Sequence, residues 1–145
     1  DSSTSRGLGD VYKRQLLPHA IEEMFRWETP VKHFLRTATE DYTLRGRSIK
    51  EGDRLMMMYA SGNRDEEVFN NPFEFQVDRR PNKQIAFGYG VHRCLGHLLA
   101  KMEMSAFYKA LLERTTDIQL NGDPAWIHAT FVSGLKRLPV RFIAR

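Results

Sequence analysis

The most constraining feature of this sequence is a decapeptide, Phe87–Gly96, that holds the only cysteine of the chain, Cys94. Around this cysteine stand three glycines: Gly88, Gly90 and Gly96. Glycine is used where a backbone turns sharply or passes close to another group, so the decapeptide suits a turn that lies against a flat, bulky ligand. A single cysteine cannot close an internal disulfide, and Cys94 is therefore a packing residue, a nucleophile or a metal ligand.

A helix is predicted directly after the cysteine. Apolar residues recur at helical spacing from Leu95 to Ala106, and this periodicity predicts a long helix over Leu95–Arg114. Cys94 then lies at or just before its first turn. Backbone N–H groups and the positive end of the helix dipole would stabilise a thiolate there and moderate the electron density that it donates to a metal.

Six positions of the decapeptide form a recognisable pattern: Phe87, Gly88, Gly90, His92, Cys94 and Gly96. This pattern resembles the haem-binding loop of the cytochrome P450 family, the haem-thiolate monooxygenases. The resemblance implies that Cys94 is the axial ligand of the iron of haem b, that Phe87 shields the sulfur, and that His92 hydrogen-bonds a haem propionate. A thiolate ligand donates electron density to iron and favours O–O cleavage.

Other uses of the cysteine stand beside this one. A single cysteine is most often a small buried hydrophobic residue. His92, Cys94 and His97 together suggest a zinc site, but a fourth ligand at the usual spacing is missing and zinc does not explain the glycines. A thiol enzyme, with Cys94 as the nucleophile and either histidine as the base, is a further alternative.

A second motif lies upstream, in a helix predicted around Ala20–Arg26 with Pro18 in its first turn. Glu23 and Arg26 are three residues apart and are therefore neighbours on one helix face. The cytochrome P450 family carries Glu-x-x-Arg in its K helix, completed by a second arginine from a later irregular segment, which corresponds here to Arg79. The resemblance implies that these three residues form a buried structural lock behind the haem and are not catalytic.

Two more positions are similar to family residues that contact the haem propionates. Arg36 corresponds to an arginine whose planar guanidinium suits a carboxylate. Gln84 stands where bacterial relatives often carry a histidine, and glutamine keeps a hydrogen-bond donor but no charge. The segments Ser61–Asp65 and Pro72–Phe75 match the part of the family that precedes its irregular meander.

The segments Pro30–Ala38 and Ala129–Gly134 resemble bacterial members that act on terpene alcohols, steroid side chains or alkyl chains. In the family, both segments line the substrate chamber. The resemblance therefore implies that four apolar residues contact the substrate: Val31, Phe34, Phe131 and Val132. On apolarity alone, these residues would be ordinary core.

The fold class that follows is α+β and mainly helical, the C-terminal portion of the cytochrome P450 fold. It comprises the K helix, a small β-sheet, the meander, the haem-thiolate loop, the long L helix and a C-terminal β-hairpin. Turn residues predict four short strands before the meander, at Phe34–Ala38, Tyr42–Leu44, Ser48–Ile49 and Arg54–Tyr59. Prolines and asparagines predict irregular chain over residues 70–83. Ile118–Leu120 and Leu138–Phe142 are expected to form a closing strand pair.

Composition narrows the setting of the protein. No apolar run is long enough to span a membrane, no secretory signal is visible, and one unpaired cysteine fits a reducing compartment, so we expect a soluble cytoplasmic protein. The formal net charge is +4, but the basic residues are scattered, which argues against nucleic-acid binding. Residues 1–15 are rich in Ser and Gly without periodicity and are expected to be a non-native or disordered tail. The haem-binding part of a cytochrome P450 domain is expected to occupy residues 16–145.

The resemblance covers only the C-terminal part of the family's fold, because the long helix over the distal haem face and most of the substrate chamber have no counterpart. It implies a haem-thiolate monooxygenase, as a partial chain, that receives electrons from a ferredoxin-like donor. This enzyme would insert one oxygen atom of O2 into a C–H bond of an apolar small molecule such as a terpene or steroid. The basic residues Arg93, His97 and Lys101 are candidates for the donor's docking surface. The alternative is a non-catalytic haem-binding remnant that lacks the oxygen-activating helix.

Overall fold

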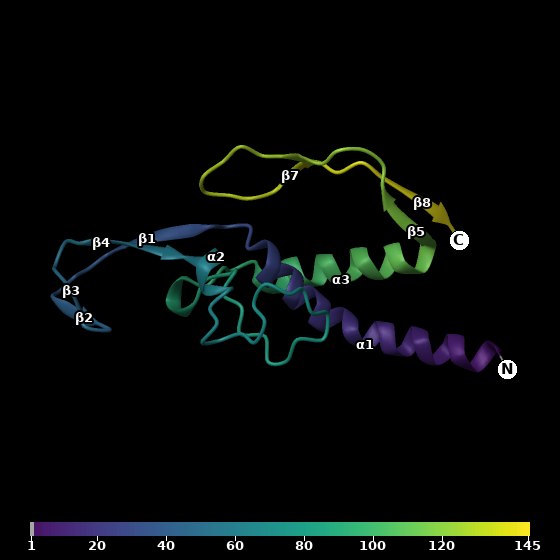
Figure 1. Cartoon of the computed structure of the whole chain (residues 1–145), viewed down its shortest axis with the longest axis horizontal. Helices are drawn as coiled ribbons and strands as arrows, with labels where there is room; N and C mark the ends of the chain where they lie inside the picture. The colour runs from purple at the N-terminus through teal and green to yellow at the C-terminus, as the bar shows by residue number, and fades with distance from the viewer. Residues whose placement is uncertain (1) are drawn as a thin grey trace.

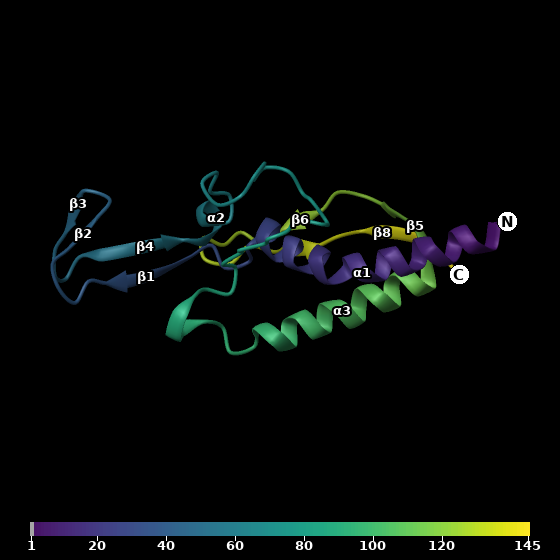
Figure 2. The same cartoon turned by 90° about the horizontal axis from the view of Figure 1, so that it is seen from below.

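Two long helices and four antiparallel strand pairs make up the fold in the computed structural model, which describes the backbone of residues 2–145 and the side chains of residues 15–145. The elements follow one another as α1 (Ser2–Glu28), β1 (His33–Thr37), β2 (Tyr42–Leu44), β3 (Arg47–Ile49), β4 (Arg54–Met58), α2 (Tyr59–Gly62), the 3-10 helix η1 (Gly90–His92), α3 (His97–Arg114), β5 (Thr115–Leu120), β6 (Ala125–Trp126), β7 (Leu135–Arg137) and β8 (Val140–Ala144). The helices α1 and α3 lie side by side, and β1–β4 extend away from one end of the pair (Figures 1 and 2). This α+β arrangement confirms the predicted fold class.

The strands before the meander are confirmed to within one residue at each end. β1 pairs with β4 from His33↔Met58 to Thr37↔Arg54, and β2 pairs with β3 as a short hairpin. The hairpin turns at Arg45 and Gly46, which both have positive φ (47° and 78°). No helix or strand lies between α2 and η1, so the predicted irregular segment over residues 70–83 is also confirmed.

The closing strand pair is confirmed, but its predicted boundaries were wrong. β5 pairs with β8 through Gln119↔Arg141 and Leu120↔Val140. β5 starts three residues earlier than predicted, at Thr115, because the C-cap of α3 is itself extended and continues directly into the strand. The two-residue strand β6 and its partner β7 are too short to produce an alternating pattern and were not predicted.

The start of the first helix is corrected. α1 begins at Ser2, so Pro18 lies inside the helix and not in its first turn. Proline lacks a backbone N–H and is tolerated best in a first turn, and this preference is what placed the predicted start near Pro18. The predicted tail over residues 1–15 falls almost wholly outside the described side chains and stays a prediction.

The buried apolar core is small and lies between α1 and the loop before Cys94. Ile21, Phe25 and Ala86 are buried, and they are packed by four partly buried neighbours: Leu17, Phe87, Ala100 and Met104. The apolar stripe of α3 is largely exposed, with Leu98 64% and Met102 68% accessible. The periodicity predicted the helix and its end at Arg114 correctly, but α3 begins at His97, with Gly96 as its N-cap, and not at the predicted Leu95. This chain does not bury the stripe.

Candidate functional site

The loop that carries Cys94 has a fixed backbone. Gly88 and Gly90 adopt positive φ (71° and 74°), a conformation that residues with a Cβ rarely accept. The N–H of Cys94 donates to the carbonyl of Phe87 at 2.9 Å, and the N–H of Gly88 donates to the carbonyl of Ile85 at 2.8 Å. Cys94 lies just before α3, as predicted, and its thiol is free and exposed.

A cavity of about 480 Å³ opens beside this loop, within the size range of small-molecule and cofactor sites. Residues from α1, the connection between α1 and β1, β1, α2 and the Cys94 loop line it: Phe25, Pro30, Val31, Phe34, Arg36, Tyr59, Ala86, Phe87, His92 and Cys94. Most of these side chains are apolar. The ring of Phe87 is held by that of Phe25, with centroids 4.5 Å apart.

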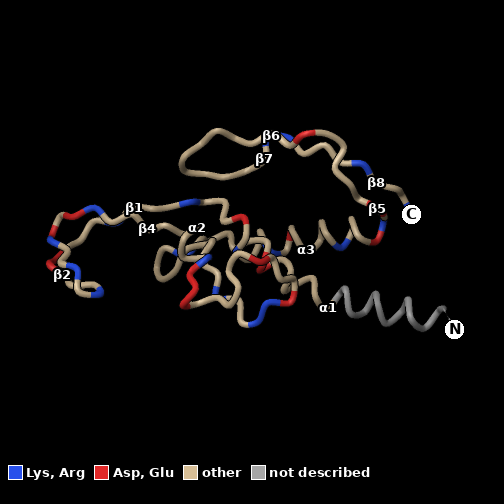
Figure 3. The backbone as a smooth tube through the Cα atoms, viewed as in Figure 1, with Lys and Arg blue, Asp and Glu red and all other residues tan. Residues whose placement is uncertain are grey.

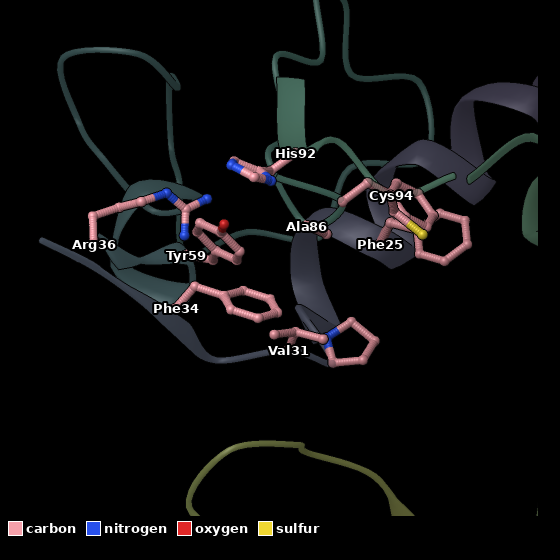
Figure 4. A pocket seen from close by; sticks show the side chains of 10 residues that line it. Phe25, Val31, Phe34, Arg36, Tyr59, Ala86, His92 and Cys94 are labelled. Atoms are coloured by element: carbon pink, nitrogen blue, oxygen red, sulfur yellow. The ribbon is translucent and has the colours of Figure 1, made fainter. Parts of the chain in front are cut away.

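The nitrogen and oxygen groups of the cavity lie on one side of it and the sulfur lies on the other (Figure 4). The guanidinium of Arg36, the imidazole of His92 and the hydroxyl of Tyr59 lie on one side, and the sulfur of Cys94 lies on the other, close to Phe25. A flat group with carboxylates along one edge and a metal at its centre would meet donors at that edge and a thiol at its face. The residues present therefore fit haem b, an iron porphyrin with two propionates.

Six residues predicted for the cofactor or the substrate lie in this cavity wall: Cys94, His92, Arg36, Phe87, Val31 and Phe34. The predicted glycines shape the loop itself, and a Cβ at Gly96 would lie 4.0 Å from the Cys94 sulfur. Gln84 does not line the cavity. Its amide nitrogen donates to Glu22 Oε2 at 3.0 Å, and its amide oxygen accepts from the N–H of Ala86 at 2.7 Å. The propionate contact expected of Gln84 stays a prediction.

Phe131 and Val132 lie behind the cavity wall and not in it. Val132 forms an antiparallel bridge with Val31. The ring of Phe131 stands edge-on to that of Phe34, with centroids 5.2 Å apart. The structure therefore brings the four predicted substrate-lining residues together, two in the wall and two supporting it.

Glu23, Arg26 and Arg79 form one buried network. Glu23 and Arg26 are completely buried and Arg79 is 6% exposed. Arg26 Nε and Nη2 donate to the two carboxylate oxygens of Glu23, both at 2.7 Å, and Arg79 Nε donates to both at 3.1 Å. Buried charges are tolerated only when they are paired and hydrogen-bonded, so each member depends on the others.

The same network ties α1 to the irregular segment. Arg26 Nη1 donates to the carbonyls of Asn63 and Pro72, both at 2.8 Å, and Arg79 Nη1 donates to that of Asn70 at 2.6 Å. Burial would raise the pKa of Glu23, but hydrogen bonds from Arg26, the Gln76 N–H and Arg79 outweigh it and lower the pKa below its ordinary value.

Sequence reasoning assigned no role to two residues that matter here, Asn63 and Tyr59. The side chain of Asn63 is completely buried, donates to Thr29 Oγ1 and accepts from the N–H of Ile85, both at 2.8 Å. The one sequence feature that pointed to Asn63 is its position within Ser61–Asp65, the segment that is similar to the family. Tyr59 lines the cavity, but it was predicted only as the last residue of a strand.

The competing uses of Cys94 find little support in the geometry. Among the described residues, no three His, Cys, Asp or Glu side chains converge on a point that could hold a metal ion. His97 Nδ1 lies 2.8 Å from the carbonyl oxygen of Cys94, and no hydrogen bond joins the thiol to a histidine within the described part of the chain. The zinc and thiol-enzyme arrangements are therefore not assembled in this structure.

Charged residues of both signs are spread along the described chain (Figure 3). Lys101, one of the three basic residues considered for electron-donor docking, forms an ion pair with Glu22 and lies 5.8 Å from the centroid of the Phe87 ring. Its charge is thus already paired within the chain. No helix in the described part of the chain is both long and apolar enough to cross a membrane.

Comparison with known proteins gives consistent matches. The family model described as Cytochrome P450 matches residues 5–125. Cytochrome P450-terp of a Pseudomonas species is 49% identical over 127 residues, covering 88% of this chain and 30% of that protein. A steroid C26-monooxygenase of Mycolicibacterium smegmatis is 45% identical over 129 residues, covering 88% of this chain and 32% of that protein.

Solved structures agree with the sequence matches. CYP108D1 from Novosphingobium aromaticivorans superposes with a TM-score of 0.86 at 45% identity, covering 91% of this chain and 32% of that one. P450BioI, solved in complex with an acyl carrier protein ligated to hexadec-9Z-enoic acid, gives a TM-score of 0.88 at 31% identity. The match covers 97% of this chain and 37% of that one. The chain thus spans about a third of the length of the relatives that it matches.

Proposed function

The chain belongs to the cytochrome P450 family, whose members use haem b, and we propose that Cys94 is the thiolate ligand of the haem iron in this protein. The observation that carries the proposal is the free thiol of Cys94 in the wall of a cavity whose opposite side holds Arg36 and His92. A thiol without a partner, on a loop with a fixed backbone, is available to a metal held in that cavity.

The other residues have binding and orienting roles in this proposal. Arg36 and His92 hold the two propionates, since a guanidinium group and a ring N–H of an imidazole both donate to carboxylates. Phe87 covers the cysteine side of the cavity and is fixed by its contact with Phe25. The lock of Glu23, Arg26 and Arg79 fixes α1, which contributes Phe25 to the wall, against the irregular segment.

The activity proposed for the whole protein is monooxygenation of an apolar small molecule. Bound haem b supplies the iron centre at which dioxygen is activated. Val31 and Phe34 present an apolar surface in the same cavity, and Phe131 and Val132 hold that surface in place. Relatives named cytochrome P450-terp and steroid C26-monooxygenase support a terpene or a steroid as the substrate class. A ferredoxin-like electron donor, a cytoplasmic location and a haem-binding part over residues 16–145 complete the proposal.

A chimera tests this function. Residues 16–145 replace the matching C-terminal part of the Mycolicibacterium smegmatis steroid C26-monooxygenase, and haem content and steroid oxidation are measured. We expect a haem-loaded chimera that oxidises the steroid, and a Cys94→Ser chimera that does not. Glu67→Gln is the matched control, because Glu67 is an exposed surface residue that pairs with Arg45 and does not line the cavity.

Each other outcome has a definite meaning. A chimera that binds haem but oxidises nothing, while the parent enzyme remains active in the same assay, would show that residues 16–145 hold haem without supporting catalysis, and it contradicts the proposed monooxygenation. A folded chimera that takes up no haem contradicts the proposal as a whole.

A further inference from the structure

Tyr59 is a buried cavity residue whose hydroxyl has no structural use within the chain. It is 7% exposed, and its ring lies 6.0 Å from that of Phe34 between centroids. Its backbone is fixed on both sides, because its N–H donates to the carbonyl of Lys32 at 3.0 Å and its carbonyl accepts from the N–H of Asn63 at 2.9 Å. The side chain is therefore held in one place before any ligand binds.

Gly88 leaves room for this hydroxyl. A Cβ at position 88 would lie only 3.3 Å from Tyr59 Oη and 3.8 Å from Cζ. The bare backbone of the Cys94 loop thus passes directly beside the polar end of the ring. The hydroxyl therefore lies against the same loop that carries the cysteine.

The hydroxyl makes no hydrogen bond to any residue in the part of the chain that the structure describes. It lies in the cavity wall on the side that also carries the guanidinium of Arg36 and the imidazole of His92 (Figure 4). The oxygen itself is open to the cavity, because Asn82 Oδ1 is the one side-chain polar atom that is buried without a partner among the described residues. The hydroxyl is therefore available to a ligand bound in the cavity, and a phenylalanine in the same space would not offer this donor.

We propose that the Tyr59 hydroxyl, with Arg36 and His92, completes a carboxylate-binding subsite at the edge of the cavity and donates a hydrogen bond to a haem propionate. Arg36 uses Nη1 to donate to the carbonyl of Leu35 at 2.9 Å and has no ion pair among the described residues. Most of its five N–H donors are thus free for a ligand. Three donors from β1, α2 and η1 converge on one edge, which suits a carboxylate. This inference rests on the proposed haem site.

The test compares haem b with its dimethyl ester, which has no free carboxylates. The chain is loaded with either porphyrin, and the rate of porphyrin loss to excess apomyoglobin is measured for the wild type and for Tyr59→Phe. We expect Tyr59→Phe to speed the loss of haem b about tenfold, the effect of one hydrogen bond to a charged group, and to speed the loss of the dimethyl ester much less, because a neutral ester carbonyl is a weaker acceptor than a carboxylate. Tyr42→Phe, an exposed tyrosine on β2, is the control and should change neither rate.

The outcomes separate this subsite from the haem site itself. Equal rates for haem b in the wild type and in Tyr59→Phe overturn the subsite, and so does an equal acceleration for both porphyrins, which would show a packing role only. A wild type that binds neither porphyrin contradicts the proposed function and the subsite with it. Tyr59→Leu provides a second variant should Tyr59→Phe not fold, because the ratio of its two loss rates removes the effect of lost packing.

Discussion

Glu23→Gln is the substitution whose effect the structure determines most closely. The Glu23 carboxylate is completely buried and accepts hydrogen bonds from Arg26, from Arg79, from the N–H of Gln76 at 2.9 Å and from Asn82 Nδ2 at 3.0 Å. Glutamine has the same shape, but it carries no charge and replaces one acceptor oxygen by a donor. Two buried guanidinium groups would then have no anion between them.

The expected loss of stability is large. Removing one partner of a buried ion pair costs about 3–5 kcal/mol, which is a substantial part of the total stability of a domain, about 5–15 kcal/mol. With a urea m value of about 2 kcal/mol/M, a loss of about 4 kcal/mol lowers the unfolding midpoint by about 2 M. A variant that is unfolded without urea has lost at least its whole stability.

Urea unfolding of the chain, followed by circular dichroism, measures this shift. Glu67→Gln is the matched control, since Glu67 pairs with Arg45 at 2.8 Å on the surface, with side chains 68% and 77% exposed. Exposed pairs contribute little, so the control should unfold at nearly the wild-type midpoint. If Glu23→Gln and Glu67→Gln unfold at the same midpoint, the buried network does not stabilise the fold and our reasoning is wrong.

Two further predictions concern the same region. Asn63→Ala should lower the free energy of unfolding by about 2–4 kcal/mol, because the Ile85 N–H and Thr29 Oγ1 each lose a buried partner. Thermal unfolding measures this loss. A loss no greater than that of the exposed control Asn121→Ala would contradict the prediction. Because the folded pKa of Glu23 lies below its unfolded value of about 4.5, the stability that it contributes is complete above about pH 5 and is lost as the pH falls through the folded pKa. The difference in urea midpoint between the wild type and Glu23→Gln should therefore shrink below about pH 4, and a difference that stays constant down to about pH 3 would refute the linkage.

The sequence was most informative where local chemistry decides structure. Glycines with positive φ and an apolar period define the loop and helix around Cys94, so both could be predicted without tertiary information. The buried network of Glu23, Arg26 and Arg79 was different. Its first two members are neighbours on one helix, but only the resemblance to a family pointed to Arg79, 56 residues away from Glu23.

The sequence could not predict features that depend on tertiary contacts, such as the hydrogen-bond partner of a polar side chain. Gln84 donates to Glu22 and does not line the cavity, and no local pattern in the sequence indicates this partner. Pro18 was read as a helix start because proline is favoured there, yet α1 continues through it. Tyr59 gave no signal of its own, because only the fold brings its hydroxyl to the side of Arg36 and His92.

The central claim is that Cys94 donates a thiolate to haem iron, and the spectrum of the reduced carbon monoxide complex tests it most directly. The chain is reconstituted with haem b, reduced and exposed to carbon monoxide, in parallel with Cys94→Ser. Our account predicts the strongly red-shifted Soret band of a thiolate-ligated haem in the wild type and its loss in Cys94→Ser. A haem-loaded wild type with an unshifted band, or a red-shifted band that survives in Cys94→Ser, would contradict it.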